Sequence, residues 1–200
     1  MKRTKLFKKR YLFLLLIGVI LALGMSSMPV SSAASTVSVN TTGNDSNNGT
    51  AANPYLTIST GINKVDNKGT VNLSQGTFNL NNGAENKDYG ITINKNVTIQ
   101  GAGSTKTIID AKGLNNVFTI QNSNVIIRDL TIENGYSLSG GAISNSLGSN
   151  LTLIDCVITD NTAFNTGGAI YNSGYLNATS NTFIGNTVVK GYGYDIYSNG

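Results

Sequence analysis

The chain has 200 residues, a formal net charge of +4, no His and a single cysteine, Cys156. The lack of His removes the commonest general base and a common ligand of transition metals, and one cysteine excludes an intramolecular disulfide. Few residues are charged, while Gly, Asn, Thr, Ser, Ile and Val are abundant, which favours short β-strands joined by turns over helices. Cys156 lies in an apolar stretch, so we interpret it as a small core side chain and not as a nucleophile.

Residues 1–34 have the organisation of a secretory signal peptide. Six basic residues, the last of them Arg10, precede the apolar stretch 11–25, and Ser32, Ala33 and Ala34 supply small residues for cleavage. The alternative is an uncleaved anchor, but a helix that spans a bilayer needs about 20 apolar residues. The sequence therefore predicts a secreted protein, extracellular or at the cell surface, with no membrane span after the signal is removed.

Removal of residues 1–34 changes the sign of the net charge. It leaves 14 − 6 = 8 basic residues against 10 acidic ones, a net charge of −2. Binding of nucleic acid requires Lys and Arg clustered on one face. No such cluster is left, so nucleic acid is not an expected partner.

Residues 35–69 are predicted to form an N-terminal cap that begins with a strand and a loop. Val37 and Val39 alternate with polar residues as in a short strand, and the Asn-rich loop 42–50 precedes Pro54. The segment 44–49 has a slight likeness to a calcium-binding loop, but it lacks acidic residues at alternate positions. We interpret it as a turn.

A short helix is predicted next. Ile58, Ile62 and Val65 lie at helical spacing, Thr57 can act as the N-cap, and Gly69 follows the expected end. A helix this short is marginal in isolation. We expect it to cover the open end of a stack of strands, where unpaired backbone groups would promote aggregation.

Residues 70–200 contain a repeat with a period of about 25–27 residues. Gly140-Gly141-Ala142-Ile143 returns in full at 167–170, and a degenerate copy follows at 193–196. Each repeat contains about three short strands with apolar residues at every second position, and no helical segment lies between them. This spacing predicts a coil of parallel strands with one turn per repeat, and it disfavours βαβ units and hairpin sandwiches.

In such a coil, equivalent residues stack at a step of about 4.8 Å. Two apolar columns are predicted to form the core: Val71, Val97, Val125, Leu151 and Leu176 in the first, and Ile93, Ile120, Ile143, Ile170 and Ile196 in the second. Polar residues near corners are expected to form structural ladders, namely Asn94, Asp129, Asp155 and Asn181. The Gly-Gly pairs are expected to allow a positive φ or a close backbone approach.

The repeat resembles a known family. Gly-Gly-Ala-Ile followed by a strand that ends in Asn, as in 158–161 and 183–186, is similar to the polymorphic outer membrane protein repeat, which also occurs in adhesin-like proteins of methanogenic archaea. Segments 42–45, 54–58, 76–78, 97–103 and 125–132 resemble the entry region of pectate-lyase-like proteins. The resemblance implies an all-β fold of the pectin-lyase-like superfamily, a right-handed parallel β-helix of about five turns with a short N-terminal capping helix.

The resemblance also implies a function in attachment. It favours a secreted or surface-displayed, non-catalytic adhesin-like protein, or a cell-envelope structural protein, whose partners are carbohydrate or a host or neighbouring cell surface. The chain stops at Asn199-Gly200 inside a turn of the coil. We therefore expect a fragment of a longer protein, with end-to-end contact through its uncapped last turn.

The alternative is a polysaccharide-active enzyme, a lyase or a glycoside hydrolase, or its carbohydrate-binding fragment. A lyase needs a cation held by clustered carboxylates and an Arg or Lys base; a hydrolase needs carboxylates about 5–9.5 Å apart. Arg128 beside Asp129 is the nearest pattern, and we interpret it as a corner ladder with an exposed Arg. No catalytic residue, metal ligand or cofactor is assigned, although three acidic residues on one strand face would favour the enzyme. The acidic residues of the repeats are Asp110, Asp129, Glu133, Asp155, Asp160 and Asp195.

Two further features concern the surface. Tyrosines gather late in the chain and are candidates for a contact patch or for ordinary corner packing; they are Tyr171, Tyr175, Tyr192, Tyr194 and Tyr197. Sequons for N-glycosylation begin at Asn40, Asn44, Asn48, Asn72, Asn96, Asn150 and Asn177. A chain rich in Asn, Thr and Ser also produces sequons by chance.

Overall fold

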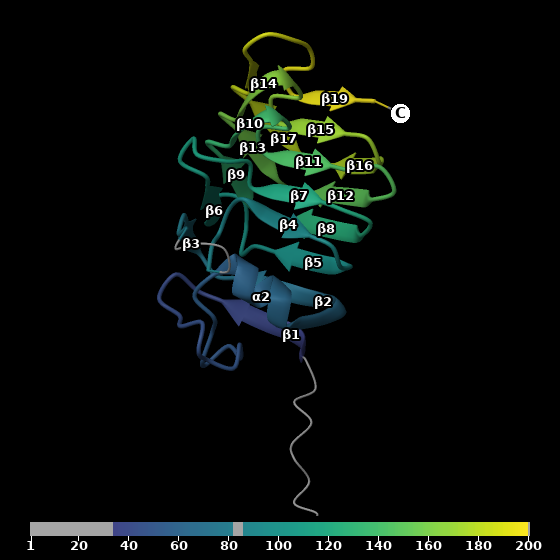
Figure 1. The fold of residues 1–200 in the computed structure, drawn as a ribbon. Helices are drawn as coiled ribbons and strands as arrows, with labels where there is room; N and C mark the ends of the chain where they lie inside the picture. The colour runs from purple at the N-terminus through teal and green to yellow at the C-terminus, as the bar shows by residue number, and fades with distance from the viewer. Residues whose placement is uncertain (1–33, 82–85, 200) are drawn as a thin grey trace, which may run out of the picture. The chain divides into compact units, whose positions relative to one another are not determined.

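Successive turns of the chain lie in register above one another in the computed structural model (Figure 1). The structure describes residues 34–81 and 86–199, which fall within the unit Ala33–Gly200. The predicted signal peptide lies outside the described residues, except for Ala34. From purple β1 to yellow β19 the strands form about five turns of a parallel coil. The parallel β-helix predicted from the repeat spacing is confirmed.

The strands form four sheets, and every strand pair within a sheet is parallel. Sheet 1 contains β1 (Ala34–Val39), β2 (Val65–Leu73), β5 (Val97–Gln100), β8 (Asn124–Arg128), β12 (Asn150–Ile154) and β16 (Tyr175–Thr179). Sheet 2 contains β3 (Gly76–Phe78), β6 (Thr107–Asp110), β9 (Thr131–Glu133), β13 (Val157–Thr159) and β17 (Thr182–Ile184). Sheet 3 contains β4 (Ile91–Ile93), β7 (Phe118–Ile120), β11 (Ile143–Asn145), β15 (Ile170–Asn172) and β19 (Ile196–Ser198). The short sheet 4, β10 (Tyr136–Ser139), β14 (Thr162–Thr166) and β18 (Thr187–Val188), was not predicted.

The apolar columns exist, but the lower members of each are displaced by two positions. Ile143, Ile170 and Ile196 stack as expected, whereas the residue below Ile143 is Phe118 and not Ile120. The column is therefore Ile91, Phe118, Ile143, Ile170 and Ile196. A shift of two positions keeps a side chain on the same face of a strand, so period-two patterning does not distinguish the two registers.

The same displacement affects the first column. Val97, Val125, Leu151 and Leu176 stack as predicted, but Val71 lies below Ile99, and Gly69 occupies the place beneath Val97. Val71 therefore belongs to the column of Ile99, which continues through Ile127 in the next turn. Both columns belong to one continuous buried core.

Of the ladder predicted at Asn94, Asp129, Asp155 and Asn181, only Asp129 and Asp155 lie one above the other. Asp129 and Asp155 occupy the same corner of successive turns, with φ of 57° and 52°. The corner requires a left-handed backbone, which Asp adopts more readily than most residues other than glycine. Asn181 lies one position further on, where its side chain bonds Cys156 N and Leu153 O. Asn94 follows β4, at a different corner.

Asparagine ladders are present elsewhere. Asn145 donates to Asn172 at 2.7 Å, and Asn161 donates to Asn186 at 3.0 Å, both inside the coil. Asn150 donates to Asn124 at 2.6 Å on the surface. These bonds join one turn to the next.

The Gly-Gly pairs act as predicted. Gly140 and Gly167, the first glycine of each pair, have φ of 70° and 65°. The second glycine permits a close approach between turns, because a Cβ on Gly141 would lie 2.1 Å from the carbonyl oxygen of Gly168. Only glycine fits both positions.

The N-terminal end differs in part from the predicted cap. β1 is the first strand of sheet 1, with Val37 beside Val71. The helix α2 (Ile58–Lys64) has the predicted N-cap, since the Thr57 side chain accepts the N–H of Thr60. It ends at Lys64, so Val65 and Gly69 belong to β2. The predicted helix is thus confirmed, but it is shorter than expected.

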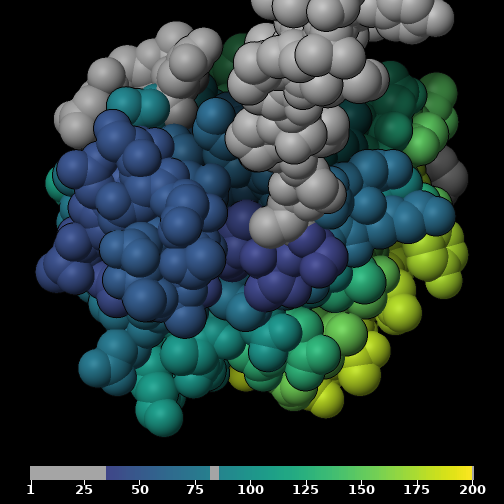
Figure 2. Space-filling view, turned by 90° about the horizontal axis from the view of Figure 1, so that it is seen from below, coloured from purple at the N-terminus to yellow at the C-terminus, as the bar shows by residue number. Residues whose placement is uncertain are grey.

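The loop before α2 covers the open edge of β1, and α2 covers the N-terminal end of the hydrophobic core. Ser38 N donates to Gly49 O at 2.7 Å, and Tyr55 N donates to Ser38 O at 2.9 Å, so the loop pairs with the free edge of β1. Figure 2 shows this end of the molecule, with the blue loop residues beside purple β1. Helix α2 packs against β1 and β2 and buries Ile58 and Ile62. The helix is too short to cross a membrane, and no other helix of the described residues is long and apolar enough to do so.

Two carboxylates hold the start of α2. Asp45 accepts the N–H groups of Leu56 and Thr57 at 2.9 Å, so it organises the loop. Buried Asp88 accepts Ile58 N and Leu80 N, each at 2.9 Å. Burial raises the pKa of Asp88 to about 6, against the opposing effect of these two N–H donors.

The raised pKa of Asp88 predicts that acid stabilises this end of the coil. A carboxyl group whose folded pKa is about 6 and whose ordinary value is 3.8 contributes stability that is present below pH 4 and is lost as the pH rises through 6. The free energy of unfolding should fall by up to about 3 kcal/mol between pH 4 and 7. Urea titrations at several pH values measure this free energy, and Asp88→Asn should remove its decrease between pH 4 and 7. An identical pH profile in the variant would contradict the assignment.

Candidate functional site

A cavity of about 380 Å³ lies where sheet 2 turns toward sheet 4. Its walls combine carboxylate, ammonium, amide and phenol groups, a mixture that suits a polyhydroxylated ligand. The lining residues are Asp110, Lys112, Gly113, Asn134, Gly135, Tyr136, Asp160 and Thr162. We call it the corner groove.

Two carboxylates, Asp110 and Asp160, line the corner groove, and a third, Glu133, lies close to both of them. Asp110 and Glu133 are direct neighbours on β6 and β9, and Asp160 follows β13 in the next turn. Burial, followed by the negative charges of Asp110 and Asp160, raises the pKa of Glu133 above its ordinary value. Asp110 and Glu133 are paired on adjacent strands and Asp160 follows the next strand, so the set only partly matches the three acidic residues on one strand face that would favour an enzyme.

The hydrogen bonds of the three carboxylates differ. Asp110 accepts Lys112 N at 2.8 Å and Asn134 Nδ2 at 3.0 Å, and Asp160 accepts the Thr159 hydroxyl at 2.9 Å. Glu133 makes no side-chain hydrogen bond to any described residue, so of the three carboxylates it accepts the fewest hydrogen bonds from the protein. Within residues 34–81 and 86–199, no three acidic, His or Cys side chains are close enough to share a metal ion.

Arg128 and Asp129, the nearest pattern to a base beside a carboxylate in the repeats, form an ion pair away from the corner groove. Arg128 Nε lies 2.7 Å from Asp129 Oδ2. The hydrogen bond and charge of Asp129 raise the pKa of Arg128 above its already high ordinary value. A guanidinium held in this way is a poor proton acceptor.

Cys156 is buried, and burial raises the pKa of its thiol to about 11. Its sulfur lies 3.5 Å from Ile127 O and 3.3 Å from Ile154 O. A thiol with this pKa is almost entirely protonated at neutral pH, so the thiolate needed for nucleophilic chemistry is scarce.

The late tyrosines are largely exposed. Tyr175, Tyr192 and Tyr194 are 64%, 76% and 66% exposed. Tyr171 and Tyr197 stack on adjacent strands of sheet 3, with ring centroids 5.8 Å apart and an interplanar angle of 9°. We call these five residues the late tyrosines. They come from β15, β16, β19 and the connection before β19, all in the last two turns.

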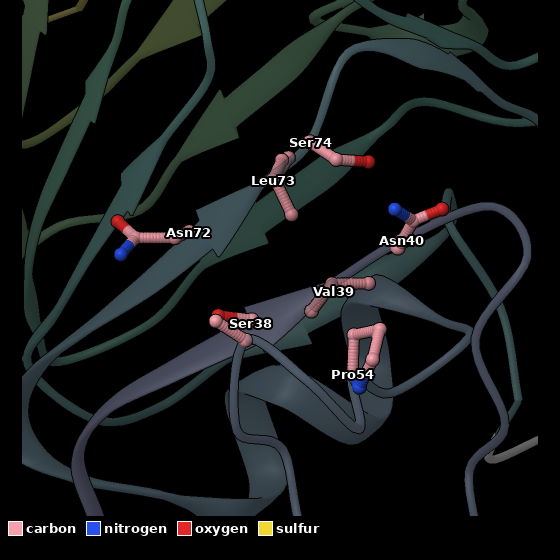
Figure 3. A pocket seen from close by; sticks show the side chains of 8 residues that line it. Ser38, Val39, Asn40, Pro54, Asn72, Leu73 and Ser74 are labelled. Atoms are coloured by element: carbon pink, nitrogen blue, oxygen red, sulfur yellow. The ribbon is translucent and has the colours of Figure 1, made fainter.

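A smaller cavity of about 220 Å³ lies beside β1 (Figure 3). Its lining residues are all neutral: Ser38, Val39, Asn40, Ala51, Pro54, Asn72, Leu73 and Ser74. It lies between the ends of β1 and β2 and the loop that covers the edge of β1. No ionisable group lines this cavity, so proton transfer has no donor or acceptor side chain there.

Sequence patterns do not reveal the corner groove, because its acidic residues are far apart in the chain. Asp110, Glu133 and Asp160 each lie roughly one repeat beyond the one before. An alignment of the repeats by the ends of their sheet 2 strands places the three acidic residues at similar positions of successive turns. In the predicted apolar columns, the lower members were two positions out of register, namely Val71, Ile93 and Ile120.

Comparison with known proteins provides a family but no close relative. The family described as "Protein of unknown function (DUF1565)" matches residues 41–199. No curated protein and no solved structure matches the chain. The match spans the loop, the helix and nearly all of the coil, so this chain belongs to the DUF1565 family.

Proposed function

We propose that this chain is a secreted, non-catalytic, adhesin-like module that attaches to carbohydrate or to the surface of a neighbouring or host cell. The observation that carries the proposal is the exposure of the late tyrosines. Three tyrosines that are each more than half exposed gather in two turns of a scaffold with few charges. Tyrosine offers a large apolar ring and a polar tip at little entropic cost, which is why it is enriched in contact surfaces.

The scaffold supports the proposal. Parallel strands stacked in register present surface side chains in regular rows, as in the extended binding surfaces of solenoid proteins. The likeness of the Gly-Gly-Ala-Ile segments to polymorphic outer membrane protein repeats, and of the upstream segments to the pectin-lyase-like superfamily, favours the same role. Fold alone does not decide function, so the surface residues must be tested.

Substitution of Tyr175, Tyr192 and Tyr194 together by serine should abolish most binding. Each substitution removes exposed apolar contact area at about 25 cal/mol per Å², so we expect at least a roughly tenfold loss of affinity. Glycan arrays and binding to whole cells of candidate hosts would measure it. Leu147→Ser, which changes an exposed residue between β11 and β12, is the matched control. Equal binding by the triple variant and the control would show that these three tyrosines do not form the binding surface.

A second candidate function, a polysaccharide-active enzyme, is favoured by the three carboxylates at the corner groove. Their separation across adjacent turns is compatible with the carboxylate pairs of glycoside hydrolases. Incubation with polygalacturonate and calcium, and with neutral polysaccharides, distinguishes the two functions. Unsaturated or shortened products that disappear in Glu133→Gln would overturn the non-catalytic proposal.

A further inference from the structure

The seven sequons occupy two different structural settings. Those of Asn40, Asn44 and Asn48 follow one another at every fourth position in the loop beside β1. Those of Asn72, Asn96, Asn150 and Asn177 all lie in or directly before strands of sheet 1. We infer that Asn48, with Asn44 as a second site, accepts an asparagine-linked glycan. The inference rests on the proposed extracellular function, because such transfer takes place outside the cytoplasm.

The loop orients the reacting groups of the sequon. Asn48 Oδ1 accepts both the N–H and the hydroxyl of Thr50, at 3.3 and 2.9 Å. Asn44 Oδ1 accepts the N–H of Ser46 at 2.9 Å. Donors on the amide oxygen polarise the carboxamide and make its N–H groups more acidic. Asn48 Nδ2 makes no hydrogen bond to any described residue, so it is available to react.

Exposure separates the three loop sites. Asn44 and Asn48 are exposed, whereas Asn40 is half-buried. Asn40 has the same pair of donors, from Thr42 at 2.9 and 3.0 Å, but it lines the 220 Å³ cavity (Figure 3). A glycan on Asn40 would meet the walls of that cavity, so Asn48 and Asn44 are favoured.

The strand sequons lack this geometry. Alternate residues of a strand are about 7 Å apart along the backbone, and in the described residues no hydrogen bond joins Asn72, Asn96, Asn150 or Asn177 to the hydroxyl two positions later. Asn150 Nδ2 already donates to Asn124 Oδ1 at 2.6 Å, and Asn96 Oδ1 accepts Asn124 N at 2.7 Å. Extended backbone and ladder bonds therefore disfavour transfer to the folded sheet.

The surrounding contacts hold the loop in place. Gly49 N donates to Asn53 O at 3.0 Å, and Asn47 Nδ2 donates to Pro54 O at 2.9 Å. Gly49 has a φ of +74°, and a Cβ there would lie 2.3 Å from the Tyr55 ring. The middle position of the Asn48 sequon thus requires glycine for structural reasons, although the sequon itself tolerates other residues.

The transfer step needs a lipid-diphosphate-linked oligosaccharide as co-substrate. Asn48 Nδ2 forms a bond to the anomeric carbon of the first sugar. The bond between that carbon and the phosphate oxygen breaks, and the lipid diphosphate leaves with the electron pair. Nδ2 loses one proton to a base of the transferase, so neither partner is oxidised or reduced.

The test uses the purified folded chain, a single-subunit oligosaccharyltransferase and a lipid-diphosphate-linked oligosaccharide. Peptide mass mapping should find the glycan on Asn48 and to a lesser extent on Asn44. Occupancy should be at least roughly tenfold above that of Asn150 and Asn177, the factor for losing one hydrogen bond to the amide. The same chain unfolded in urea and then diluted into the reaction should lose this preference. No glycan on Asn48, or equal occupancy of the strand sites in the folded chain, would overturn the inference.

A glycine variant separates the loop geometry from the sequon. Gly49→Ala keeps Asn48 and Thr50 but overlaps the Tyr55 ring, so occupancy of Asn48 should fall severalfold while the thermal melt verifies folding. Gly148→Ala changes another glycine of positive φ, at +80°, where the nearest atom is 3.3 Å away, and should leave Asn48 unaffected. Unchanged occupancy in Gly49→Ala would refute the role of the loop. The assay requires no export, so its failure would leave the adhesin-like function standing.

Discussion

Replacing Ile170 by aspartate is expected to lower the free energy of unfolding by about 2–5 kcal/mol. Ile170 is completely buried, with Ile143 beneath it and Ile196 above it in the same column. A carboxylate there would lose its hydration without gaining a partner, and protonation to avoid the charge would itself cost stability at neutral pH. Urea or thermal unfolding followed by circular dichroism would measure the change.

The control for this substitution lies on the outer face of the same sheet. Thr92 is exposed in β4, and Thr92→Asp should change the free energy of unfolding by no more than about 0.5 kcal/mol. If both variants were equally stable, the stacked register of sheet 3 would be incorrect. A large loss of unfolding free energy in Ile170→Asp but not in Thr92→Asp would support the buried column of sheet 3.

Replacing Asn161 by leucine is expected to cost about 3 kcal/mol, although leucine is similar in size and more apolar. The buried Asn161 side chain accepts Gly135 N at 2.7 Å and donates to Ile132 O and Thr159 O at 3.2 and 2.8 Å. Leucine would leave a buried N–H without a partner and remove bonds from two carbonyl groups. Each unsatisfied buried group costs about 1–3 kcal/mol.

Asn150→Leu is the matched control for Asn161→Leu. Asn150 also bonds an asparagine of the neighbouring turn, but it is exposed, so water replaces the lost hydrogen bond with Asn124. We expect a loss below about 1 kcal/mol. Chemical denaturation of both variants would compare them, and a similar loss in the two would mean that burial does not determine the strength of these ladders.

Local patterns predicted the elements of the fold well. Period-two apolar residues identified the strands of sheets 1 to 3 but not those of sheet 4. The regular recurrence of the Gly-Gly-Ala-Ile segment identified the coil, and Thr57 identified the start of α2. The Gly-Gly pairs were assigned correctly because a positive φ at Gly140 and the close approach at Gly141 are backbone properties that only glycine accommodates. These features depend on a few neighbouring residues.

The register of the columns was not predictable in the same way. Phe118 and Ile120 both face inward, so alternation alone allows either to lie beneath Ile143. The turn of the coil that runs from β7 through β8, β9 and β10 to β11 decides that it is Phe118. A consequence is that the column above Ile93 and Ile120 continues as Asn145 and Asn172, two asparagines inside the coil. Asn145 Nδ2 donates to Asn172 Oδ1 and to Tyr175 O, whereas Asn145 Oδ1 is buried without a hydrogen-bond partner among the described residues.

The amino-acid sequence by itself determined that the chain is a stack of short parallel strands with a helix near one end, because the alternation and the repeat length are written along the chain. Only the tertiary structure decided which residues share a surface. It brought Asp110, Glu133 and Asp160 to one corner, paired the loop with the edge of β1, and distinguished the Asn48 sequon from those in the sheet. The physical reason is that contacts between turns depend on the length and conformation of every corner, and these are set by packing across the whole coil.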